Sequence, residues 1–346
     1  MEEQKQTKRN KFGKLHDKYY KLLLLIPIIL ILFSVIFMVN FYSQEKDFIY
    51  KDVSLTGGTS VTIYDKIDAA GLRNSLEGQL EEINIRQTYD LITGEQKEVI
   101  IETKTEGAQT RKILEEYLGY KLTKDNSSFE FSGPALSESF YRQLLLSILY
   151  AFSFMGIVVF FLFSKKSKIK FIVLIISLIS PVLFLMFKAI SLQAAMALAM
   201  AALILSLYFY IRHNVPSFAV IISAFADILM TLVVVNMFGM KMSSAGIVAF
   251  LMIIGYSVDT DILLTTRLLK RSRGSLNEKM WGAFKTGITM TLTSLLAVIA
   301  ALIVVKSFSL VLTQIFIILA IGLGFDIFNT WVTNASILKW YVRSKE

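Results

Sequence analysis

Long apolar stretches recur along the chain and are separated by polar connections. The first runs from Leu22 to Phe41 without a charged residue. About 20 apolar residues in a row are enough for a helix to cross a ~30 Å hydrocarbon core. The pattern predicts a polytopic α-helical membrane protein with eight spans and a membrane bundle over residues 143–338. The seven later spans are expected at about residues 143–163, 169–188, 192–211, 217–238, 243–264, 286–305 and 309–330.

One long polar region, residues 42–142, interrupts the spans. About 100 residues are enough for a compact domain. Alternating residue types predict four strands, at 60–64, 83–89, 98–104 and 128–131. Helical spacing predicts one helix after the N-cap Asp68 and a second from about Ala108 to the stop signal Gly119. The first helix is expected to carry Leu72, Leu76, Leu80 and Ile83. The order β-α-β-β-α-β is that of a ferredoxin-like α+β domain.

Glycine and metal-binding residue types give little sign of a ligand site. Gly57 and Gly58 precede the first predicted strand, where glycine permits a turn or a close backbone approach. No phosphate-binding glycine pattern surrounds them. The chain has no cysteine and two histidines, His16 and His213, which excludes disulfides and thiolate or histidine-rich metal sites. We therefore expect neither a metal nor a cofactor.

The net charge of +9 is concentrated in particular connections. Basic residues gather at 1–21, 164–168, near 212, at 265–285 and at 339–346, whereas the alternate short connections carry one each. This positive-inside bias predicts cytoplasmic tails at 1–21 and 339–346, with residues 42–142 extracellular. The charge is thereby explained by orientation and does not indicate nucleic-acid binding. The first span exceeds a signal-peptide core and lacks a cleavage site, so it is expected to be an uncleaved anchor.

Four acidic residues fall inside predicted spans: Asp227, Asp259, Asp261 and Asp326. A rise of 1.5 Å per residue puts Asp227 ~15 Å and Asp259 ~12 Å from the cytoplasmic ends of their spans. A carboxylate at that depth costs roughly 2.5–3.5 kcal/mol and usually faces the bundle interior or water. No lysine or arginine lies comparably deep. The acids must therefore be protonated part of the time, hydrogen-bonded, or paired with a basic residue of another chain.

These acids suggest a proton relay or a conformational switch, with Asp259 expected to matter more than Asp261. The supporting polar neighbours are expected on one face of the seventh span, at Thr286, Thr289 and Thr293. The alternative is a structural acid satisfied by threonine and asparagine, and this is the preferred interpretation for Asp326. An intramembrane aspartyl protease is disfavoured, because two acids two residues apart diverge by about 200° on a helix and cannot share a proton. We therefore expect no enzymatic activity.

Several segments resemble signatures of the archaeal-type SecF family, in the family's order. Gly255–Arg267 (GYSVDTDILLTTR) resembles the family's fourth span, and Thr286–Leu295 (TGITMTLTSL) its fifth. Shorter matches are Gly57-Gly58 before the external domain, Gly133–Leu136 before the second span, Val215–Ser217 with Ala224–Asp227 in the third, and Asn329–Trp331 in the last.

The resemblance implies an accessory subunit of the preprotein translocase. Such a subunit pairs with SecD, associates with the SecY-type channel, and promotes export of preproteins across the cytoplasmic membrane. In bacteria the process is coupled to proton flow through a bundle like that of RND transporters. By the resemblance, Asp259 falls where SecD carries its key acid, and Asp227 where SecF has an intramembrane acid. Membrane lipids are the remaining expected partner, and Gly255 belongs to the fourth-span motif.

The sequence departs from the family pattern in two places. The family has six spans, whereas residues 168–211 add an apolar hairpin between the second and third. Thr286, with Lys285 beside it, aligns with an arginine of bacterial SecF. The alternative function from another class is a half-unit of an RND-type small-molecule transporter. Those proteins typically carry two large external domains and about twelve spans in one chain, so a smaller unit with one external domain needs a partner in either case.

Overall fold

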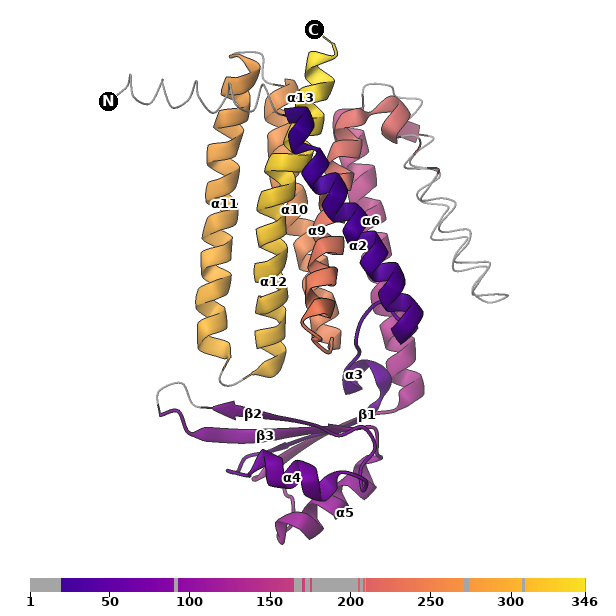
Figure 1. The fold of residues 1–346 in the computed structure, drawn as a ribbon, viewed down its shortest axis with the longest axis vertical. Coiled ribbons are helices and arrows are strands. Elements are labelled where there is room, and N and C mark those ends of the chain that lie inside the picture. The colour runs from indigo at the N-terminus through magenta and orange to yellow at the C-terminus, as the bar shows by residue number, and fades with distance from the viewer. Residues whose placement is uncertain are drawn as a thin grey trace.

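The computed structural model of the chain consists of a helical bundle and a small α+β domain beyond one end of the bundle (Figure 1). It describes residues 20–345 except 90–92, 165–169, 271–273 and 307–308, and it also leaves out residues 172–209 apart from Ile175, Leu205 and Tyr208. The C-terminal end of the chain lies at the end of the bundle opposite the α+β domain (Figure 1).

The bundle contains six helices that are long and apolar enough to cross a membrane, counted over the described residues. Six of the eight predicted spans are thereby confirmed as apolar helices. The other two, at 169–188 and 192–211, fall almost wholly outside the described residues. The helices are α2 (Leu25–Glu45), α6 (Pro134–Phe163), α9 (Val215–Met237), α10 (Ser244–Lys270), α11 (Leu276–Val305) and α12 (Leu310–Phe328), the last continuing through the π-helical turn η1 (Asn329–Asn334) into α13 (Ala335–Arg343).

The α+β domain has the predicted order of elements. Its sheet is antiparallel throughout, with the strand order β2-β3-β1-β4. The two helices cover the face of the sheet that is turned away from the bundle (Figure 1), and Val61, Leu72 and Leu114 are fully buried in the domain's core. The elements are β1 (Gly58–Ile63), α4 (Ala69–Leu76), β2 (Asn84–Tyr89), β3 (Gln96–Thr103), α5 (Gly107–Leu118) and β4 (Ser127–Ser132).

Local signals behave as expected at most ends of these elements. Asp68 caps α4 by accepting hydrogen bonds from the backbone N–H groups of Ala70 and Gly71. Gly119 ends α5 in the left-handed region, at φ 74°. However, α4 was predicted to reach Leu80 and Ile83 and ends at Leu76. Gly78, at φ 92°, turns the chain just beyond it, in a conformation that interrupts a right-handed helix.

The boundary between the domain and the second span differs from the expectation. Residues 134–142 were assigned to the external domain, but they form the first part of α6, which begins at Pro134. Proline is favoured at a first helical position because its missing N–H would have no partner there. Gly57, at φ 83°, approaches this start closely, since a Cβ at Gly57 would lie 2.5 Å from Pro134 Cα. The glycine therefore supplies both the turn and the close approach.

Candidate functional site

Three of the four predicted intramembrane acids converge inside the bundle. Asp227 comes from the middle of α9, Asp261 from α10 and Asp326 from the last turn of α12. Their exposed fractions are 0%, 0% and 1%. We call these three residues the acid cluster. It combines helices that are far apart in the sequence, so no single span contains the site.

Small and polar residues at helical spacing bring these helices together. On α9, Ser223 lies one turn before Asp227, and on α10, Ser257 lies one turn before Asp261, which places each pair on one helix face. All four are buried. Gly322 of α12 packs directly against the side chain of Ile253 on α10, with no room for a Cβ. The small residue therefore allows α12 to bring Asp326 close to α10.

Asp227 accepts two side-chain hydrogen bonds, one to each carboxyl oxygen. Ser257 Oγ donates to Oδ2 at 2.5 Å, and Asn329 Nδ2 donates to Oδ1 at 2.7 Å. Thr333 in turn donates to Asn329 Oδ1 at 2.9 Å, which fixes the orientation of that amide. Asp227 is thereby connected to α10 and to the π-helical turn.

Asp261 concentrates its hydrogen bonds on one oxygen. Its Oδ1 accepts from Asn334 Nδ2 at 2.8 Å, from Thr330 Oγ1 at 2.9 Å and from Ser223 Oγ at 3.3 Å. Its Oδ2 is buried and has no hydrogen-bond partner among the described residues. A buried polar atom without a partner carries a penalty of about 1–3 kcal/mol. Asp261 is therefore the least completely satisfied acid of the cluster.

Asp326 shares a hydroxyl group with Asp261. Thr330 Oγ1 lies 3.2 Å from Asp326 Oδ1 and 2.9 Å from Asp261 Oδ1. Thr260 Oγ1 lies 2.9 Å from Asp326 Oδ1 and 2.9 Å from the carbonyl oxygen of Ser257. Thr291 of α11 donates to Asp326 Oδ2 at 3.2 Å.

Thr260 and Thr330 have fewer hydroxyl protons than their oxygens have hydrogen-bond contacts. A threonine hydroxyl donates one proton, and an ionised carboxylate only accepts. Thr260 and Thr330 together have two protons for four contacts with Asp261, Asp326 and the Ser257 carbonyl. A proton on one of the carboxyl groups supplies a third donor. Two hydroxyl protons therefore cannot satisfy all four contacts while both carboxyl groups are ionised.

The π-helical turn η1 carries three of the cluster's donors. Asn329 contacts Asp227, Thr330 contacts Asp261 and Asp326, and Asn334 contacts Asp261. In an α-helix, residues five apart diverge by about 140°. The wider π turn brings Asn329 and Asn334 toward the same side, and such turns are frequent at functional sites. These donors were not predicted from the sequence, although a polar run in an apolar span, Asn329-Thr330 and Thr333-Asn334, was a visible signal.

Asp259 lies apart from the acid cluster. Its side chain is exposed on the face of α10 that points away from the bundle interior, which we call the outer side of α10. No hydrogen bond or ion pair joins it to another described residue. The divergence predicted for Asp259 and Asp261 is confirmed, but the ranking of the two acids is not supported by their positions, since Asp261 is the one inside the site. Gly255, one turn before Asp259, is also exposed, and a Cβ there would meet no atom within 4 Å.

The threonines expected to support the acids do not contact them. Thr286, Thr289 and Thr293 each donate to a backbone carbonyl of α11 itself. Thr291, two residues from Thr289, is the α11 residue that reaches Asp326. Close packing sets this rotation of α11: a Cβ at Gly287 would lie 2.5 Å from the Trp331 ring, so the face with Gly287 and Thr291 must point inward. Among the described residues, no group of three or more His, Asp or Glu has the arrangement of a metal site.

Known proteins with similar sequences are protein-export membrane proteins. Residues 177–344 match the family described as "Protein export membrane protein SecD/SecF, C-terminal". Over 332 residues, the chain is 35% identical to the protein-export membrane protein SecF of Methanocaldococcus jannaschii, covering 94% of this chain and 96% of the relative. The SecF of Methanothermobacter thermautotrophicus is 32% identical over 331 residues, with 94% and 93% covered.

A solved structure shares the fold. The crystal structure of SecDF from Thermus thermophilus, described as a translocon-associated membrane protein, matches with a TM-score of 0.60 and 16% identity. The match covers 94% of this chain and 38% of the longer SecDF chain. The chain thus spans well under half of that protein.

Proposed function

The chain belongs to the SecF family of protein-export membrane proteins, and from this we propose that it is an accessory subunit of the Sec translocase that promotes export of preproteins through a proton-holding acid cluster. Similarity over 94% of the chain to proteins named for export supports the role in the Sec translocase. The burial of Asp227, Asp261 and Asp326 supports the role of the acid cluster. Nothing in the similarities favours a small-molecule transporter, and no enzymatic activity is proposed.

The acid cluster is proposed as a relay or switch because its hydrogen bonds depend on one proton. With a proton on Asp261 or Asp326, three of the four contacts of Thr260 and Thr330 have a donor, against two when both carboxyl groups are ionised. Loss of that proton leaves two carboxylates sharing too few donors, in a medium of low dielectric constant where like charges repel strongly. The helices α10 and α12 would then separate or rotate. A change of charge at the cluster is thereby converted into a change of helix packing.

We propose that the outer side of α10 binds a SecD-like partner. Val248, Met252 and Tyr256 are 41–44% exposed, and with Gly255 and Asp259 they form one helix face. A carboxylate facing lipid at this depth is unfavourable by roughly 2.5–3.5 kcal/mol. A protein surface with a polar or basic group opposite Asp259 removes that cost. Gly255 leaves open space beside the acid, which suits the close approach of a second helix.

Replacing Gly255 by leucine is expected to release the SecD-like partner while the chain stays in the membrane. The added side chain fills the space that the partner helix would occupy, and its Cβ meets no atom of this chain within 4 Å. The measurement is the amount of partner that co-purifies with a tagged chain in mild detergent. Gly324→Leu on α12 is the matched control, because Gly324 is also exposed with no atom within 4 Å of a Cβ. Equal co-purification with both variants would show that the partner binds elsewhere.

The remaining assignments concern orientation and the wider assembly. We propose that both termini are cytoplasmic and that the ferredoxin-like domain, with β1 to β4, lies outside the cell. The basic connections and the position of the domain beyond one end of the bundle support this (Figure 1). A domain on the outer side is suited to contact preproteins as they leave a SecY-type channel. Contacts with membrane lipids are expected along exposed apolar faces such as that of α2.

Single cysteines test this orientation without background, because the chain has none of its own. Gln109→Cys, at an exposed position of α5, is expected to react with a membrane-impermeant thiol reagent in intact cells. Lys345→Cys, exposed near the C-terminus, is expected to react only after the membrane is opened. Labelling of Lys345→Cys in intact cells, or protection of Gln109→Cys there, would reverse the proposed topology.

A further inference from the structure

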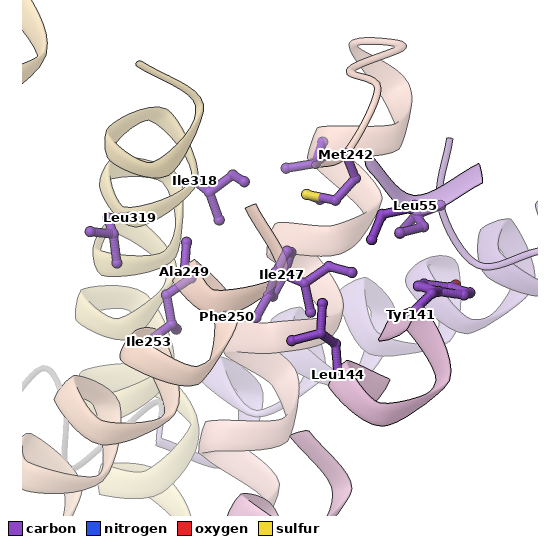
Figure 2. Close-up of a cluster of buried hydrophobic side chains, with 12 residues drawn as sticks. Leu55, Tyr141, Leu144, Met242, Ile247, Ala249, Phe250, Ile253, Ile318 and Leu319 are labelled. Atoms are coloured by element: carbon purple, nitrogen blue, oxygen red, sulfur yellow. The ribbon is translucent and has the colours of Figure 1, made fainter. Parts of the chain in front are cut away.

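The segment between α2 and β1 is joined to the loop between α9 and α10 by backbone hydrogen bonds. Met242 N donates to the Tyr50 carbonyl at 2.6 Å, and Asp52 N donates to the Met242 carbonyl at 3.0 Å. The short helix α3 (Val53–Thr56) follows directly. Its Leu55 is 1% exposed and lies among bundle side chains that include Met242 and Leu144 (Figure 2). The domain is therefore anchored in the bundle core by α3.

Ser54 connects the two sides of this junction through its side chain. Its Oγ donates to Asp52 Oδ1 at 2.6 Å, and its backbone N–H donates to the same oxygen at 2.9 Å. Ser54 Oγ also accepts a hydrogen bond at 3.0 Å from the backbone N–H of Ser244, the first residue of α10. One hydroxyl thus links Asp52, on the domain side, to the outer end of α10.

The same loop is held from the other side by α12. Gln314 Oε1 accepts from Ser243 N at 3.0 Å, and Gln314 Nε2 donates to the Lys241 carbonyl at 2.6 Å. Gln314 is 9% exposed. The loop therefore lies between the domain anchor and α12. The two helices that it contacts, α10 and α12, are those that carry Asp261 and Asp326 deeper in the bundle.

We propose that Asp52 and Ser54 form a joint that couples the position of the external domain to α10, and through it to the acid cluster. Both are positioning residues, since neither touches a substrate or the cluster itself. The inference rests on the proposed function of the cluster. A rotation or shift of α10 moves the Ser244 N–H, and Ser54 transmits this movement to α3. Because Leu55 and Gly57 hold α3 against the bundle core and the start of α6, a small displacement there reorients β1.

The joint is also suited to respond to protons on the domain side. Burial raises the pKa of Asp52 to about 6, and Glu102 of β3 acts in the same direction, whereas the hydrogen bonds from Ser54 and the charge of Arg86 on β2 lower it. The hydrogen bond that reaches Ser54 from the bundle comes from the backbone N–H of Ser244, which does not titrate. Protonation removes the charge that strengthens both bonds from Ser54. The joint is thus tighter above about pH 6.

Two spin labels measure the coupling in the complete protein, reconstituted with its SecD-like partner. Cysteines replace Lys112 on α5 and Lys306 after α11, both exposed. Pulsed electron paramagnetic resonance then gives the distribution of distances between the label on the domain and the label on the bundle. Asp261→Asn is expected to shift this distribution when Ser54 is present, and the shift is expected to be lost with Ser54→Ala. Ser54→Thr keeps the hydroxyl and should restore it, and Ser139→Ala, an exposed serine of α6, is the control.

A second variant keeps the test decisive if Ser54→Ala inserts poorly. Asp52→Asn retains an acceptor oxygen without a titratable charge, so the difference between the distributions at about pH 5 and about pH 7 should become smaller. The joint is disproved if Asp261→Asn gives no shift in the native background, or the same shift with and without Ser54. It is also disproved if the pH dependence is unchanged in Asp52→Asn. Export is measured in the same variants. Normal export by Asp261→Asn refutes the function of the cluster. If Asp261→Asn abolishes export but shifts the distance distribution equally with Ser54 and with Ser54→Ala, only the joint is refuted.

Discussion

Asp261→Asn is expected to reduce export to the level of cells that lack the chain, while the protein stays in the membrane and bound to its partner. Asparagine has nearly the size of aspartate and keeps one acceptor oxygen, which can still receive the bonds from Asn334 and Thr330. It cannot gain or lose the carboxyl proton. The measurement is the rate of precursor processing in a strain without the native gene, with membrane abundance determined in parallel.

The companion variant Asp259→Asn distinguishes the role of Asp259 from that of Asp261. Because Asp259 is exposed on the outer side of α10, its loss is expected to weaken partner association and to affect export only through that binding. The sequence alone predicted the reverse ranking, with Asp259 as the switch. Full export by Asp261→Asn at normal abundance would contradict the role of the cluster. A drop in abundance alone would instead indicate a structural acid.

Thr330→Val is expected to slow export by at least about tenfold. Valine has the shape of threonine without the hydroxyl, so the helix packing is retained while Asp261 and Asp326 both lose a partner. Hydrogen bonds to charged groups contribute about 1.5–3 kcal/mol each, and each ~1.4 kcal/mol corresponds to a tenfold change in rate. The measurement is again precursor processing at matched membrane abundance.

Thr293→Val is the matched control for that substitution. Thr293 donates only to backbone carbonyls of α11, at Thr289 and Met290, and it contacts none of the acids. Its loss is expected to leave export within the experimental error of the native chain. If Thr293→Val were as harmful as Thr330→Val, the effect would come from altered spans in general and not from the bridge between Asp261 and Asp326.

The spans and the order of the α+β domain could be predicted because their signals are strong and local. Some twenty apolar residues in a row specify a spanning helix by themselves. Asp68 and Gly119 mark helix ends through their own backbone preferences. The early end of α4 was missed because Leu80 continues the apolar spacing, and the turn at Gly78 competes with it. The four-residue helix α3 is too short to give a periodic signal.

The residues that form the site were harder to predict, because a spanning helix is apolar all round. Lipid and bundle core both accept leucine, so the sequence of α11 does not show which side is buried. Thr289 and Thr291 differ by about 200° around the helix, and only contact with Trp331 at Gly287 selects Thr291 for the interior. The same uncertainty affected Asp259 and Asp261. The π-helical turn has no sequence signature of its own, so the polar run at 329–334 marks possible donors but not the acid that each one contacts.

Depletion of the chain provides the most direct test of the central claim, that this protein promotes preprotein export through its acid cluster and a SecD-like partner. The measurement is a pulse-chase of a secreted precursor after depletion, together with efflux of a fluorescent small molecule from the same cells. The account predicts that the precursor accumulates, that re-expression of the native chain but not of Asp261→Asn restores processing, and that efflux is unchanged. Normal processing with impaired efflux would contradict it and identify a small-molecule transporter.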